Sequence, residues 1–334
     1  MLLAVLFWIN TSSWALGQVI TGSGSTFAFP VMAEWARTYQ RTTGISVEYQ
    51  PVGSTAGLVN LQSSIADFAV SDAPLAGSQL LDERLSQFPL VIGAIVPIVN
   101  LDGIGPAQLH LTGQTLADIY LGKIKNWNDP ALLQLNPNLA LPNKPIVVVY
   151  RSDGSGTTYN WTDYLSKVSS EWRAVIGSGL LVQWQTGFSA KGSGGVAEKV
   201  LHVKGAIGYV ELSYALQSRM SYALIRNRAG NYVVPSDQSF RAAIAAVDWS
   251  REPDFHVLLT DPPASDAYPI MATSFVLVRR HPSDMQRAYK TRAFFLWALS
   301  SGRGIATSLN YLPLPPDLLK QIETAWLVPR LQTD

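Results

Sequence analysis

The residues best suited to chemistry in this sequence form the segment Arg151-Ser152-Asp153-Gly154-Ser155-Gly156-Thr157-Thr158. Arg151 supplies a permanent, forked cation that can hold an anion through two parallel hydrogen bonds. Ser155, Thr157 and Thr158 add hydroxyl donors. Arg151 and the two glycines favour anion binding. The alternative is a simple helix cap formed by Ser155 or Thr157, and these residues alone leave it open.

The elements on either side of this segment explain how it would be positioned. It follows an uninterrupted apolar run over residues 146–150, which is typical of a fully buried strand. Beyond it, apolar residues recur at i, i+3, i+4 and i+7, as on one face of a helix: Trp161, Tyr164, Leu165 and Val168. The segment is therefore predicted to connect a strand to a helix. The N-terminus of a helix attracts anions, because its first N–H groups lack partners and carry partial positive charge.

The same combination of small residues and a helix start recurs along the chain. Residues 22–27 (Gly-Ser-Gly-Ser-Thr-Phe) precede a helix that Pro30 opens and Gly44 ends. Residues 53–57 open a helix that runs to about Ile65, and residues 187–195 precede a helix at 196–203. Strands and helices alternate throughout, so we expect an α/β fold. If the loops converge, their N–H and hydroxyl groups could enclose a small anion.

Besides Asp153, Asp72 is the acidic residue that lies near these helix starts. It follows the short apolar strand Phe68-Ala69-Val70 and precedes Pro74. Ligands of open α/β sheets gather at the ends of strands, which favours a place at the site. A turn-forming aspartate with no contact to a ligand is the other interpretation.

Composition limits the classes of function. The 334 residues are 47% hydrophobic and 15% charged, enough for a large core and, by length, two domains. With 25 basic and 24 acidic residues the net charge is +1, so no nucleic-acid surface is expected and an anion must be held by local geometry. Cysteine is absent and the four histidines lie far apart, so we expect neither a metal site nor another cofactor.

Five motifs together give this chain a specific resemblance. They are Thr-Phe at 26–27, Gly-Ser at 53–54, Ser-Asp-Ala-Pro-Leu at 71–75, Arg-x-Asp-Gly-Ser-Gly-Thr at 151–157 and Gly-x-Ile-Gly-Tyr-Val-Glu at 205–211. In this order and spacing the chain resembles the periplasmic phosphate-binding proteins of ATP-driven (ABC) phosphate importers. The resemblance covers essentially the whole chain after residue 17. It implies a two-lobed Venus-flytrap fold of type II, with a hinge between the lobes and phosphate clamped in the cleft.

Carried over residue by residue, the resemblance also implies the site. The phosphate contacts would be Thr26, Phe27, Ser54, Asp72, Arg151, Ser155, Gly156 and Thr157, the first two through their backbone. Asp153 would pair with Arg151 and hold its guanidinium in place. The second loop departs slightly from the family pattern, because Thr55-Ala56 follows Ser54 where two small residues are usual.

A carboxylate in an anion site has a specific consequence. An ionised Asp72 can only accept hydrogen bonds, so it requires a ligand that carries a proton. Phosphate keeps at least one proton near neutral pH, since its second pKa is about 6 to 7 by analogy with phosphate esters. Sulfate carries none and would face an unpaired buried repulsion. The sequence therefore predicts that Asp72 discriminates against sulfate.

Residues 1–17 are expected to be a secretory signal. Residues 1–9 are continuously apolar but too short to span a bilayer, and the small residues near Gly17 allow cleavage before Gln18. The usual basic segment before the apolar run is missing, which allows a start upstream of Met1. We expect a periplasmic, monomeric protein that delivers phosphate to ABC permease subunits in the inner membrane.

The predicted domains follow from two long apolar segments. Residues 89–100, as one or two strands, and the strand at 270–279 are expected to cross between the lobes. Lobe 1 would then comprise residues 18–96 and 269–334, and lobe 2 residues 97–268.

Other functions remain open at this stage. An envelope or extracellular scavenging or adhesion protein of the same fold would retain phosphate binding, and another tetrahedral oxyanion such as sulfate, molybdate or tungstate could be the ligand. A phosphatase or phosphoryl transferase is not expected, because the sequence contains neither a G-x-S-x-G elbow nor a G-x-x-x-x-G-K-[ST] loop.

Overall fold

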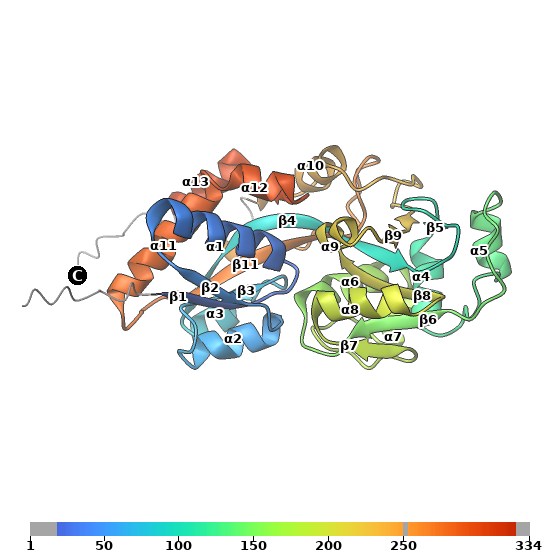
Figure 1. Cartoon of the computed structure of the whole chain (residues 1–334), viewed down its shortest axis with the longest axis horizontal. Coiled ribbons are helices and arrows are strands. Elements are labelled where there is room, and N and C mark those ends of the chain that lie inside the picture. The colour runs from blue at the N-terminus through green and yellow to red at the C-terminus, as the bar shows by residue number, and fades with distance from the viewer. Residues whose placement is uncertain (1–18, 250–252, 325–334) are drawn as a thin grey trace, which may run out of the picture.

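The computed structural model describes residues 19–249 and 253–324, so the predicted signal segment lies outside the described residues. The elements within the predicted lobe 1 are β1 (Ile20–Gly24), α1 (Phe29–Thr43), β2 (Val47–Gln50), α2 (Ser54–Gln62), β3 (Phe68–Ser71), α3 (Gly77–Asp82), β11 (Met271–Arg279), α11 (Met285–Leu299), α12 (Arg303–Ser308), β12 (Leu312–Pro313) and α13 (Pro316–Ile322). Most of them occupy the left half of Figure 1.

The remaining elements are β4, which crosses the predicted lobe boundary, and those that follow it in the chain as far as β11. They are β4 (Leu85–Val99), β5 (His110–Leu111), α4 (Gly113–Tyr120), α5 (Pro130–Leu135), β6 (Val147–Arg151), α6 (Gly156–Val168), α7 (Ser170–Val175), β7 (Phe188–Ala190), α8 (Gly192–His202), β8 (Ala206–Glu211), α9 (Leu212–Gln217), β9 (Ser221–Tyr222), β10 (Leu224–Ile225), α10 (Asp237–Ala245) and the short 3₁₀ helix η2 (Pro253–Phe255). The alternation of strands and helices confirms the predicted α/β class.

A curled sheet runs through both lobes in the order β2-β1-β3-β11-β4-β8-β6-β7. β1 pairs in parallel with β2 and β3, and β6 pairs in parallel with β7 and β8. β11 and β4 are antiparallel to their neighbours and join the two parallel groups. Parallel strands separated by helices place their carboxyl ends, and the loops that follow, at one edge of each group.

β4 is the element that links the two lobes. The sequence left one or two strands open between residues 89 and 100, and the structure has a single strand of 15 residues. Residues 85–94 of β4 pair with β11, whereas residues 95–99 pair with β8. Figure 1 shows β4 running from one half of the molecule to the other. The change of partner near residue 95 lies next to the predicted lobe boundary at 96/97.

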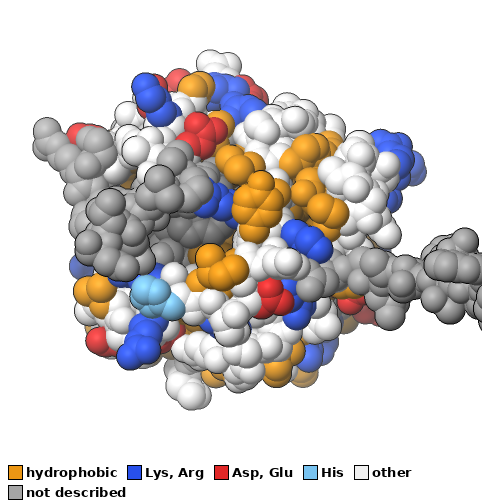
Figure 2. Space-filling view, turned by 90° about the vertical axis from the view of Figure 1, so that its left-hand side faces the viewer, with side chains coloured by type: hydrophobic (Ala, Val, Ile, Leu, Met, Phe, Trp, Pro, Cys, Tyr) orange, Lys and Arg blue, Asp and Glu red, His pale blue; other side chains and the backbone are white. Residues whose placement is uncertain are grey.

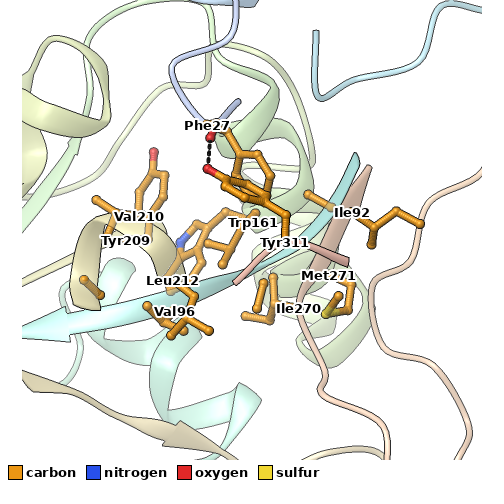
Figure 3. Packing of buried hydrophobic residues seen from close by; sticks show 14 of the residues in the cluster. Phe27, Ile92, Val96, Trp161, Tyr209, Val210, Leu212, Ile270, Met271 and Tyr311 are labelled. Carbon is orange, nitrogen blue, oxygen red and sulfur yellow. Dashed lines mark hydrogen bonds between the residues drawn. The ribbon is translucent and has the colours of Figure 1, made fainter. Parts of the chain in front are cut away.

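Apolar side chains pack against the sheet in both lobes (Figure 3). In lobe 2, the rings of Trp161 on α6 and Tyr209 on β8 stack with centroids 4.7 Å apart. In lobe 1, Tyr311 meets the ring of Phe27 edge-on at 5.8 Å and donates a hydrogen bond of 2.6 Å to its carbonyl oxygen. These contacts hold α6 and the loop before α1 against the core.

The face of the molecule drawn in Figure 2 gives little sign of long-range attraction for an anion. Figure 2 shows one end of the molecule, where basic and acidic side chains are scattered among apolar and neutral ones. This distribution agrees with the net charge of +1. Among the described residues, the helices are all too short or too polar to cross a membrane.

Candidate functional site

The N-terminus of α6 lies at the centre of the site. Ser155 is its N-cap and accepts a hydrogen bond from the Thr158 N–H at 3.2 Å, as the capping interpretation predicted. The Ser155 N–H donates to the carbonyl oxygen of Leu180, and the Gly156 N–H donates to Ser54 Oγ at 3.0 Å. Of the first four N–H groups of this helix, only that of Thr157 has no acceptor within the described chain. Thr157 is 1% exposed, so this donor is free for a buried ligand.

The N-terminus of α2 faces α6 from the opposite lobe. The Gly156–Ser54 bond joins the two helix starts, and the Thr55 N–H donates to the carbonyl oxygen of Gly154 at 3.2 Å. Ser54 Oγ accepts from Gly156, so its own proton remains available as a donor. The Ser54 N–H has no acceptor among residues 19–249 and 253–324. The N-termini of α2 and α6 therefore each bring an unpaired N–H donor to the place where the two helices meet.

The loop before α1 contributes the third group of donors. The N–H groups of Thr26 and Phe27 lie outside any helix or strand and have no acceptor in the described part of the protein. Thr26 Oγ1 contacts Ser193 Oγ at 2.9 Å and accepts from the Ser193 N–H at 3.1 Å. Because Ser193 belongs to α8, this pair also joins the two lobes.

Arg151 and Asp153 form the ion pair that the resemblance implied. Arg151 Nε donates to Asp153 Oδ1 at 2.8 Å, and Nη2 donates to Oδ2. Burial alone would raise the pKa of Asp153, but the bonds from Arg151 hold it below its usual value. The Gly192 N–H also donates to Asp153 Oδ1 at 2.9 Å. Arg151 is 2% exposed and uses two of its five N–H donors on Asp153, so three remain for a ligand.

Asp72 lies at the end of β3 and is 1% exposed. Its Oδ1 accepts from Ser25 Oγ at 2.6 Å and from Ser274 Oγ at 2.7 Å, and its Oδ2 accepts from Thr157 Oγ1 at 3.3 Å. Burial raises the pKa of Asp72, whereas Ser25, Ser274, Arg151 and Thr157 oppose this rise. The Asp72 carboxylate therefore lies at the same site as the donors of Arg151 and of the α6 N-terminus.

The structure brings all the predicted site residues into one contact network. The side chain of Asp153 is 12% exposed and the other predicted site residues are buried, so water is largely excluded. Asn160 on α6 strengthens the network, because its Nδ2 donates to the carbonyl oxygens of Asp72 at 2.7 Å and Gly156 at 2.9 Å. The described residues hold no cluster of three or more histidine, cysteine or acidic side chains arranged for a metal ion.

The sequence alone did not identify several members of the network. Ser25 lies beside Thr26 in the Gly-Ser-Gly-Ser-Thr-Phe motif, and Ser193 lies in the Gly/Ser run at 187–195. Both are hydroxyl residues next to a helix start, so residue type and position could have identified them. α8 begins at Gly192, four residues before the predicted start at 196. Ser274 carried a weaker signal, as a buried hydroxyl within an otherwise apolar strand. Its contact with Asp72 follows from the sheet order.

Comparisons with solved structures agree with this fold. The subatomic-resolution structure of a high-affinity periplasmic phosphate-binding protein (PfluDING) bound with phosphate matches with a TM-score of 0.74. It is 22% identical, and the match covers 93% of this chain and 94% of that one. A putative phosphate ABC transporter substrate-binding protein with bound phosphate from Clostridium perfringens matches with a TM-score of 0.65 at 20% identity, covering 89% of this chain and all of that one. The predicted two-lobed type II fold is confirmed.

Sequence comparisons identify the family. The model of the PBP superfamily domain matches residues 10–301. The phosphate-binding protein PstS of Xylella fastidiosa is 48% identical over 307 residues, covering 92% of this chain and 84% of that protein. The PstS of Pasteurella multocida is 45% identical over 329 residues, covering 98% and 94%. With these matches, the chain belongs to the PBP superfamily and, within it, to the family of PstS phosphate-binding proteins.

Proposed function

We propose that this protein binds inorganic phosphate between its two lobes and delivers it to an ABC permease. The observation that carries the proposal is the buried set of unpaired donors: the N–H groups of Thr26, Phe27, Ser54 and Thr157 and the free N–H groups of Arg151. Buried polar groups without partners are costly, so such a set favours an anionic ligand that satisfies them. The family supports phosphate as that anion.

Asp72 supports phosphate over other tetrahedral oxyanions. Among the described residues its Oδ2 accepts only the long bond from Thr157, which leaves it able to accept a hydrogen bond from a ligand hydroxyl. Monohydrogen and dihydrogen phosphate supply that proton, whereas sulfate, molybdate and tungstate do not. Sulfate would instead set its charge against a buried carboxylate.

Calorimetry of the protein freed of bound ligand tests the proposal. Phosphate should bind, arsenate should compete because it shares the shape and protonation of phosphate, and sulfate should give no binding heat. A preference for sulfate would overturn the assignment and favour the alternative oxyanion.

The lobe boundaries remain part of the proposal. The change of β4 partner from β11 to β8 at residues 94–95 supports a lobe 1 of residues 18–96 and 269–334 and a lobe 2 of residues 97–268. The lobes would open and close by a hinge in these crossing strands, and the closed form would dock on the permease. Small-angle scattering should show a more compact particle with phosphate than without it.

We place the protein in the periplasm as a monomer, exported by residues 1–17. Fractionation of cells that express the full chain tests the location, and light scattering of the purified protein tests the monomer. An envelope scavenging or adhesion role would keep phosphate binding but need no permease. Deletion of the permease genes would then leave the phenotype of a knockout of this gene unchanged.

We expect no enzymatic activity, since the family is one of substrate-binding transport proteins. Incubation with a chromogenic phosphate ester should release no product above the buffer rate. Turnover that disappears in an Arg151→Ala variant would reveal a phosphatase.

A further inference from the structure

Ser274 faces the site from β11, and its hydroxyl contacts Asp72. It is fully buried in β11, a strand that is otherwise largely apolar. The antiparallel register pairs Phe275 of β11 with Ser71 of β3, so Ser274 lies opposite the next position, Asp72, where β3 ends. The β11–β4 register also shifts between Ser274 and Phe275. Such irregularities often turn a side chain toward a functional site.

The two hydroxyl bonds make the oxygens of Asp72 unequal. Oδ1 accepts two short hydrogen bonds, from Ser274 at 2.7 Å and Ser25 at 2.6 Å. Within the part of the chain that the structure describes, Oδ2 accepts only from Thr157, at 3.3 Å. Oδ1 is therefore occupied by the protein, and Oδ2 is the oxygen left for a ligand.

We propose that Ser274 is a positioning residue that fixes Oδ2 of Asp72 toward the ligand and so sets the preference for phosphate over sulfate. This inference rests on the proposed function. Without the Ser274 hydroxyl, Oδ1 loses one of its two donors and the carboxylate can rotate. A protonated Asp72 can donate a hydrogen bond to sulfate, and a rotated carboxylate no longer presents Oδ2 to the proton of phosphate, so the discrimination falls.

The pH dependence of this discrimination follows from the surroundings of Asp72. The charged and titratable groups that interact with it are Arg151 on β6, Glu211 on β8, Tyr49 on β2 and Tyr311 before β12. Burial already raises the pKa of Asp72, and Ser274 counteracts that rise. Loss of Ser274 should therefore allow sulfate to bind at a higher pH than in the wild type.

Ser274 gives a cleaner test than Ser25. Ser25 Oγ also accepts from the Ala28 N–H at 3.2 Å, so its removal would disturb the start of α1 as well. Ser274→Cys keeps the shape of the side chain, with a somewhat larger terminal atom, but supplies only a weak donor. The matched control is Thr273→Val, because Thr273 is the adjacent buried residue and its hydroxyl has no hydrogen-bond partner among the described residues.

The experiment is competitive calorimetry of phosphate and sulfate between pH 5 and pH 8.5. Loss of a hydrogen bond to a charged group typically changes an affinity by at least about tenfold. Ser274→Ala and Ser274→Cys should therefore lower the ratio of phosphate affinity to sulfate affinity by at least about tenfold at pH 7. Their sulfate binding should persist to higher pH, and Thr273→Val should match the wild type.

Three outcomes would overturn the inference. Ser274→Ala could keep the wild-type ratio and pH profile while Asp72→Asn loses them, which would leave the proposed function intact. Ser274→Cys could behave as wild type while Ser274→Ala does not, which would assign Ser274 a packing role. A wild type that fails to bind phosphate would overturn the proposed function itself, and the inference with it.

Discussion

Gly156 and Asp72 meet backbone to backbone where the two lobes touch. A β-carbon added to Gly156 would lie 2.6 Å from the Asp72 nitrogen, closer than real β-carbon contacts allow. The nearest atoms belong to the backbone of Asp72 and Ala73, directly after β3, so they cannot rotate away as a side chain could. Glycine at position 156 is therefore required by this contact between lobes.

Gly156→Ala should weaken phosphate binding and leave the fold of each lobe intact. Overpacking of this kind costs about 1–3 kcal/mol, which corresponds to roughly 5- to 150-fold in affinity. Calorimetry measures the affinity, and circular dichroism checks the fold. Gly304→Ala is the control, because no atom lies within 4 Å of its added β-carbon. Wild-type affinity in Gly156→Ala would show that the lobes need not approach this closely.

Arg151→Lys should weaken phosphate binding by at least about tenfold. Lysine lacks the planar fork that bonds Asp153 twice and leaves further donors for the ligand, and hydrogen bonds to charged groups contribute about 1.5–3 kcal/mol. Arg37 offers a matched control, since it forms a similar pair with Glu34 on the surface of α1 and is 63% exposed. Arg37→Lys should leave affinity unchanged. If Arg151→Lys and Arg37→Lys changed phosphate affinity equally, the claim that Arg151 binds the ligand would be contradicted.

Glu211→Gln should change how stability depends on pH. Glu211 is 1% exposed, and neither carboxyl oxygen has a hydrogen-bond partner in the described chain. Burial raises its pKa well above the usual value. The folded state then holds a proton that the unfolded state releases above about pH 4.3. Protonated Glu211 therefore contributes its full share to the free energy of unfolding below about pH 4.3, and this contribution is lost as pH rises toward the pKa of the folded state.

The Tm difference between Glu211→Gln and wild type should therefore become more positive from pH 4.5 to pH 8. Thermal unfolding without phosphate measures it. Glu198→Gln, on the exposed side of α8, should show no such trend. A difference that stays constant with pH would mean that Glu211 is ionised in the folded protein.

Much of the site could be predicted because its signals are local. Ser155 stands directly before the helix it caps, and Arg151 and Asp153 are two positions apart at the end of one strand. The donors of Thr26 and Ser54 occur where small residues precede helices. Such features depend on neighbours in the chain, and residue type and spacing specify them.

The remainder depends on contacts between distant segments. Ser274 reaches Asp72 across 202 positions because β11 inserts between β3 and β4. Thr26 meets Ser193 across 167 positions because the lobes touch. The unpaired state of Glu211 depends on what surrounds it, which no local pattern specifies. These relationships required the order of strands in the sheet.

The most direct test of the account is a sulfate titration of wild type and Asp72→Asn at neutral pH. The amide of asparagine can donate where the carboxylate only accepts. We predict that the wild type binds phosphate and rejects sulfate, whereas Asp72→Asn binds sulfate measurably. Unchanged selectivity in Asp72→Asn would contradict the claim that Asp72 recognises the proton of the ligand.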